Sequence, residues 1–110
     1  PSEIFVTVSR SYNASHLRSK DIIVNYVKDE WLDLGRTVAK TVYGNEVSVY
    51  DMERTICDII RVRSKKDPQM FAYAIKEYAK SANKNLPRLM KYAKEFGVEA
   101  ELRKYMEVLL

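Results

Sequence analysis

Three carboxylates lie close together in the segment over residues 50–66, which reads YDMERTICDIIRVRSKK. Asp51, Glu53 and Asp58 are of a residue type that binds metal ions or transfers protons when a fold gathers several of them. On a helix, however, Glu53 and Asp58 are five positions apart and point about 140° away from each other. This spacing argues against a single catalytic or metal-binding cluster.

The same residues have simpler roles if a helix begins here. Asp51 is a good N-cap residue, and Glu53 lies in the first turn, where the helix dipole favours a negative charge. Arg54 and Asp58 are four positions apart on one face, which predicts an ion pair. We therefore interpret Asp51, Arg54 and Asp58 as structural residues. We expect a chain that is not an enzyme, with no catalytic residues, no metal site and no cofactor.

Cysteine and histidine offer little other chemistry. The chain has one of each, Cys57 and His16, so a disulfide framework and a zinc site built on these residue types are not expected. A Cys–His nucleophile pair stays open, but Cys57 lies in an apolar stretch of the expected helix, which favours a buried, unreactive thiol. The three glycines, at positions 35, 44 and 97, are too scattered for a phosphate-binding loop.

Basic residues give the clearest indication of a partner. Residues 1–50 hold six basic and six acidic side chains, and residues 51–110 hold thirteen and nine, so the net charge of +4 lies in the second half. Several of these cations recur at helical spacing. That pattern is typical either of a solvated helix face or of a surface for a phosphate backbone or an acidic protein. The candidate binding residues are Arg61, Arg63, Lys65, Lys66, Lys80 and Lys84.

The expected secondary structure changes from strands to helices near residue 50. Residues 4–9 alternate apolar and polar side chains, and residues 22–27 form a short β-branched run, so both are expected strands. Gly44-Asn45 lies between two further runs, over 36–43 and 46–50, and predicts a hairpin with a two-residue loop. Residues 1–50 are therefore expected to be rich in strands.

From residue 51 the apolar residues follow the helical period. Expected helix starts are Asp51, Asp67-Pro68, Asn85 or Leu86, and Glu99, with Gly97 ending the third helix. The apolar stripes of these helices predict a core that includes Ile56, Ile59, Ile60, Leu89 and Phe96. The expected fold is α+β, in which a small, mainly antiparallel sheet of about four strands packs against about four helices.

Length and composition predict one domain over residues 1–110. No apolar run approaches the roughly 18 residues of a membrane span, and no signal peptide is evident. Together with the single cysteine, these features lead us to expect a cytoplasmic protein. The chain begins Pro1-Ser2 without a methionine, which suggests that a preceding domain is missing.

From Gly44 onward the sequence resembles the C-terminal domain of AbiEi-family proteins, the antitoxins and transcriptional regulators of type IV toxin–antitoxin (abortive infection) systems. The resemblance is carried by GNEVSVYDMERTICDIIRVR at 44–63, FAYAIKEYAKSANKNLPRLMKYAKEFGV at 71–98 and LRKYMEVLL at 102–110. Within these stretches, VYDMERTICD is the most specific part. Residues 1–43 match the strand-rich lead-in of the family more loosely.

This resemblance implies an antitoxin domain that counters a nucleotidyltransferase-like toxin in phage defence. It also implies an N-terminal winged-helix domain that binds the promoter of the operon, which residues 1–50 do not contain. It provides no catalytic role for Glu53, Arg54 or Asp58. The alternative function is an accessory nucleic-acid-binding or dimerisation domain of a transcriptional regulator without an antitoxin role. Neither function implies a membrane or a small-molecule substrate.

Overall fold

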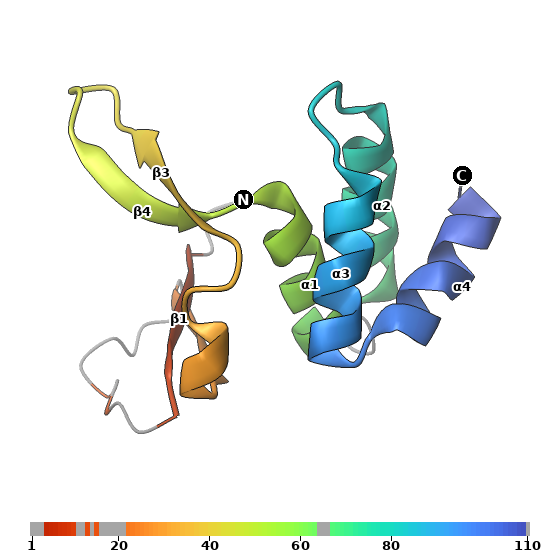
Figure 1. The fold of residues 1–110 in the computed structure, drawn as a ribbon, viewed down its shortest axis with the longest axis horizontal. Helices are drawn as coiled ribbons and strands as arrows, with labels where there is room; N and C mark the ends of the chain where they lie inside the picture. The colour runs from red at the N-terminus through yellow and green to blue at the C-terminus, as the bar shows by residue number, and fades with distance from the viewer. Residues whose placement is uncertain (1–3, 11–12, 14, 16–21, 64–66, 110) are drawn as a thin grey trace. The chain divides into compact units, whose positions relative to one another are not determined.

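The computed structural model describes residues 4–10, 13, 15, 22–63 and 67–109 (Figure 1). These residues form four α-helices and two sheets of two strands each, so the predicted mixture of α and β structure is confirmed. The chain divides into two compact units, residues 1–34 and residues 35–110. The hairpin that we expected in the strand-rich half belongs to the second unit, together with all four helices.

The first unit contains strands β1 (Ile4–Ser9) and β2 (Ile22–Val27) and the short 3-10 helix η2 (Asp29–Trp31). β1 and β2 are parallel, and their register aligns Thr7 with Asn25. The amide of the buried Asn25 donates a hydrogen bond to the hydroxyl of Thr7 across the pair, at 3.3 Å. Most of the expected polar loop over residues 11–20 lies outside the described residues.

The prediction of a single, mainly antiparallel sheet of about four strands is wrong. β1 pairs with β2 in parallel, whereas β3 (Arg36–Lys40) and β4 (Glu46–Tyr50) form a separate antiparallel pair. Alternation of side chains identifies a strand, but it does not say which strand is its neighbour. The twelve residues between β1 and β2 are long enough for the crossover connection that a parallel pair requires.

The β3–β4 hairpin is present as predicted, but its loop is longer. Residues 41–45 form the loop, in which Thr41 N donates to Asn45 O at 2.9 Å and Gly44 N donates to Thr41 O at 3.0 Å. Gly44 has a φ of +83°, a conformation that glycine adopts without strain. All side chains of β3 and most of those of β4 are exposed. The hairpin therefore does not pack a sheet face against the helices as we expected.

The helices begin and end close to their predicted positions. They are α1 (Met52–Arg63), α2 (Pro68–Lys80), α3 (Leu86–Phe96) and α4 (Glu99–Leu109). The side chain of Asp67 caps α2 by accepting from Met70 N, and that of Asn85 caps α3 by accepting from Arg88 N. α3 ends at Gly97, whose φ is +73°. Local capping signals were therefore sufficient to place these helix ends.

The core of the second unit lies where α1 contacts both α2 and α3, and α4 also contacts α2 and α3 (Figure 1). Ile56, Ile60, Leu89 and Phe96 are buried as predicted. The prediction for Ile59 on α1 is wrong, however, because Ile59 is only half-buried. The physical reason is that Glu53, Arg54 and Asp58 are themselves buried, so the covered side of α1 is not its apolar stripe alone.

Candidate functional site

The charged residues at the start of α1 lie inside the second unit. Arg54 is fully buried, and Glu53 and Asp58 are almost fully buried. Because α1 contacts α2 and α3, charged side chains that point in different directions from its axis are covered. We call Asp51, Glu53, Arg54, Asp58 and Arg61, with the tyrosines that bind them, the α1 network.

Arg54 is held by charge and by aromatic rings. Its Nε donates to Asp58 Oδ2 at 3.0 Å, and Arg61 Nη2 donates to the other oxygen of Asp58 at 2.9 Å. The Arg54 guanidinium lies 4.2 Å from the ring centroid of Tyr50 and 4.7 Å from that of Phe96. The predicted ion pair of Arg54 with Asp58 is therefore present. The Asp58 carboxylate accepts hydrogen bonds from two arginines.

Asp51 connects three parts of the unit. Its Oδ1 accepts from Arg54 N at 2.8 Å, which is the predicted helix cap, and its Oδ2 accepts from the hydroxyl of Tyr92 at 2.8 Å. The backbone N of Asp51 donates to Gly35 O at 2.8 Å. Burial, and secondly the hydrogen bond to the Asp51 carboxylate, raise the pKa of Tyr92 to about 12. Tyr92 is therefore a neutral hydrogen-bond donor at physiological pH.

Glu53 has partners that the sequence analysis missed. Its Oε2 accepts from the hydroxyl of Tyr78 at 2.6 Å and from Asn85 N at 3.0 Å. Burial, followed by this hydrogen bond, moves the pKa of Tyr78 far above its ordinary value. One signal was available in the sequence: Glu53 lies three and seven positions before Ile56 and Ile60, on the same helical stripe.

The open side of the network is next to Arg88. Its Nη1 lies 3.9 Å from Asp51 Oδ2 and 3.9 Å from Glu53 Oε1, and its side chain is 48% exposed. The network carboxylates thus accept hydrogen bonds from tyrosine hydroxyls, arginines and backbone amides of the same chain. In the described part of the chain, no three histidine, cysteine, aspartate or glutamate side chains are placed to hold a metal ion. This arrangement of hydrogen bonds is suited to holding the first turns of α1 in place.

The single cysteine lies deep in the same unit. Cys57 has no exposed surface, and its Sγ is 4.0 Å from Leu89 O. Burial, and secondly the nearby charge of Asp58, raise the pKa of the thiol to about 12, so the thiol is protonated at neutral pH. His16, the other member of the Cys–His pair considered above, lies outside the described residues.

The predicted binding residues occupy different environments. Lys80 and Lys84 are exposed, and their ammonium groups approach Glu77 Oε2 at 3.2 Å and Ser81 O at 3.3 Å. Arg61 instead belongs to the α1 network, where it donates to Asp58. The side chain of Arg63, and residues 64–66 with Lys65 and Lys66, lie outside the described part.

Four further cations of α2 and α3 are exposed with Lys80 and Lys84. We use the term exposed cations for the set Lys76, Lys80, Lys84, Arg88, Lys91 and Lys94. Residues 68–96 contain these six basic residues and two acidic residues, Glu77 and Glu95. This part of the surface is therefore positively charged. Among the described residues, we find no helix with the length and apolar character needed to span a membrane.

Comparison with known proteins assigns no family. No protein-family model matches the chain, and no curated protein matches it. The resemblance to AbiEi-family antitoxins therefore stays a prediction that rests on the sequence stretches quoted above.

Proposed function

We propose that this chain is an antitoxin domain of a type IV toxin–antitoxin system, belonging to an AbiEi-type regulator that represses its own operon. It acts in the cytoplasm, by binding and not by catalysis, and it counters a nucleotidyltransferase-like toxin. The supporting observation is the distribution of charge in the second unit. The carboxylates most suited to catalysis accept hydrogen bonds within the chain, whereas the side chains of the exposed cations are accessible to solvent.

The exposed cations favour an acidic partner. If all six contact phosphates of DNA or RNA, the logarithm of affinity falls with the logarithm of salt concentration at a slope of roughly −5. Phosphate contacts position a protein without specifying sequence. We therefore expect this domain alone to bind nucleic acid weakly, with a dissociation constant on the order of 10⁻⁴–10⁻⁶ M. Promoter specificity is then the task of the expected winged-helix domain.

Rescue of growth tests the antitoxin function. The chain is co-expressed with the nucleotidyltransferase-like toxin encoded beside its gene, and growth is compared with that of cells expressing the toxin alone. Restored growth supports the proposal. If the folded chain restores no growth at matched expression, the antitoxin function is refuted, and nucleic-acid binding with the salt dependence above would favour the accessory-domain alternative.

A charge-reversal variant tests the role of the surface. Lys80→Glu with Lys84→Glu reverses two exposed cations, and Arg103→Glu with Lys104→Glu reverses the same amount of charge on the exposed side of α4. We expect the first variant to lose nucleic-acid binding or rescue, and the second to keep both. Loss of binding with intact rescue would assign the surface to the promoter, and loss of rescue would assign it to the toxin or its RNA substrate. If both variants behave alike, the exposed cations are not the binding surface.

A further inference from the structure

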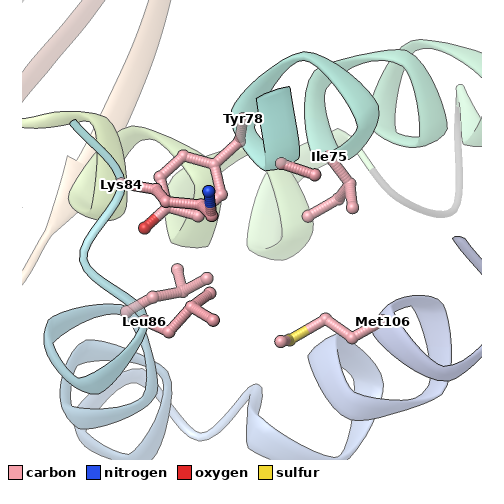
Figure 2. Close-up of a pocket in the computed structure, with 7 residues that line it drawn as sticks. Ile75, Tyr78, Lys84, Leu86 and Met106 are labelled. Atoms are coloured by element: carbon pink, nitrogen blue, oxygen red, sulfur yellow. The ribbon is translucent and has the colours of Figure 1, made fainter. Parts of the chain in front are cut away.

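An apolar cavity opens among three helices of the second unit, and no carboxylate is among the described residues that line it. Its volume is about 210 Å³. Its apolar walls come from α2, α3 and α4, and they comprise Ile75, Tyr78, Ala79, Leu86, Leu89 and Met106. Figure 2 shows Met106 extending from α4 toward Leu86, with Ile75 and Tyr78 on the α2 side. The cavity is thus built by residues from well-separated parts of the sequence.

The size of the cavity limits what it can hold. An apolar cavity of about 150 Å³ in another protein binds benzene, and sites for drug-sized molecules begin near 300 Å³. A cavity of about 210 Å³ therefore suits a short alkyl chain or a single substituted ring. Water is a poor occupant, because a buried water needs two to four polar partners and the walls are almost entirely apolar side chains.

One charged residue, Lys84, is among the described residues that line the cavity. It comes from the turn between α2 and α3, its side chain is exposed, and its ammonium group donates to Ser81 O at 3.3 Å. An ammonium group at the edge of an apolar cavity complements a ligand that has a negative charge at one end and an apolar tail at the other.

We propose that this cavity binds a small monocarboxylate with an apolar tail about as long as that of octanoate. The tail lies between Leu86, Leu89 and Met106, and the carboxylate lies at Lys84. The ligand also contacts the ring of Tyr78, whose hydroxyl holds Glu53. Binding at the cavity thus stabilises a residue that anchors the start of α1. This site goes beyond the antitoxin function and needs neither a toxin nor nucleic acid.

A titration of the protein labelled with ¹³C at its methionine methyl groups tests the site. We expect octanoate to shift the Met106 signal saturably, with a dissociation constant on the order of 1 mM. The signal of Met70, which is exposed near the start of α2, should not move. Octanol, which has the same tail without the charge, should bind more weakly. An unmoved Met106 signal, or equal shifts at both methionines, overturns the proposal.

Two variants separate the tail from the charge. Ala79→Leu places a larger side chain in the cavity and should remove binding of both ligands, whereas Ala100→Leu, at an exposed position of α4, should leave binding unchanged. Lys84→Gln should weaken octanoate binding about two- to fivefold and leave octanol binding unchanged, with Lys80→Gln as its matched control. If Ala79→Leu does not fold, the lysine pair still decides. Equal octanoate binding by Lys84→Gln and the wild type refutes the carboxylate site.

Discussion

Two ion pairs of the second unit have nearly the same length but different surroundings. Arg54 Nε lies 3.0 Å from Asp58 Oδ2, and Lys80 Nζ lies 3.2 Å from Glu77 Oε2. The Arg54 side chain has no exposed surface, whereas the Lys80 side chain is 76% exposed. Distance alone therefore does not set the energetic weight of an ion pair. Desolvation does, because a buried charge that loses its partner cannot be stabilised by water instead.

Removal of the buried cation is expected to have the largest effect on stability. Arg54→Met should lower the free energy of unfolding by about 3–5 kcal/mol, because it leaves the buried Asp58 with Arg61 as its remaining cationic partner. Urea denaturation measures the change. A loss below about 1 kcal/mol would show that the methionine packs well enough between Tyr50 and Phe96 to compensate, and the α1 network would then not be a stabilising feature.

A substitution at Gly35 tests how tightly the residues of the α1 network are packed. A Cβ atom at Gly35 would lie 2.7 Å from Arg54 Cβ and 3.2 Å from Tyr92 Cε2, and the φ of Gly35 is +79°. Gly35→Ala should therefore cost about 2–4 kcal/mol, from backbone strain and from overpacking. Gly44→Ala is the matched control, since its φ is +83° but no atom lies within 4 Å of the added Cβ. The control should cost about 1–2 kcal/mol, and equal losses would show that the space around Gly35 adjusts.

The tyrosine hydroxyls provide a smaller effect with a distinct pH dependence. Tyr92→Phe should lower the free energy of unfolding by about 1–2 kcal/mol at neutral pH, because Asp51 loses a donor. The pKa of Tyr92 is about 12 in the folded protein and 10.0 for an unperturbed tyrosine. The stabilisation is therefore fully present below pH 10.0 and is lost as the pH rises through about 12. Urea melts of both proteins at several alkaline pH values measure the difference, and a constant difference would contradict this account.

The smallest expected effect is that of the exposed pair. Lys80→Met removes the cation that faces Glu77, and it should change the free energy of unfolding by less than about 0.5 kcal/mol, because water and salt already screen the interaction. Melts at low and high salt measure this change beside that of Arg54→Met. A loss for Lys80→Met comparable to that for Arg54→Met would remove the distinction between the two regions.

The features that the sequence predicts well are those with local causes. The caps at Asp67 and Asn85, the stop at Gly97 and the Arg54–Asp58 pair each depend on residues within one or two helical turns. The missed features depend on distant residues. Glu53 meets Tyr78, 25 positions away, and Asp51 meets Tyr92, 41 positions away. Periodicity marks which side of a helix is covered, but it does not say what covers it, so the sequence analysis explained Glu53 by the helix dipole alone and missed its buried partners.

The predictions of the strand pairing and of the length of the hairpin loop were wrong for a related reason. The pairing of β1 with β2 depends on the path of the connecting residues, which composition alone does not define. The Gly44-Asn45 signal located the hairpin, yet the hydrogen bonds of Thr41 extend the loop to five residues. A valine and a tyrosine at positions 42 and 43 have high strand propensity, and the turn geometry overrides that preference.

The pairing within α1 has a consequence for how the chain folds. Arg54, Asp58 and Arg61 lie on one helix, so these charges partner each other as soon as two turns of α1 form, without closing a long loop. The contacts of Tyr78 and Tyr92 with α1 require α2 and α3 to arrive from far along the sequence. We expect the folding transition state to contain a largely formed α1 in which the ion pairs of Asp58 are already present. The hydrogen bonds of the tyrosine hydroxyls are expected to form after the transition state.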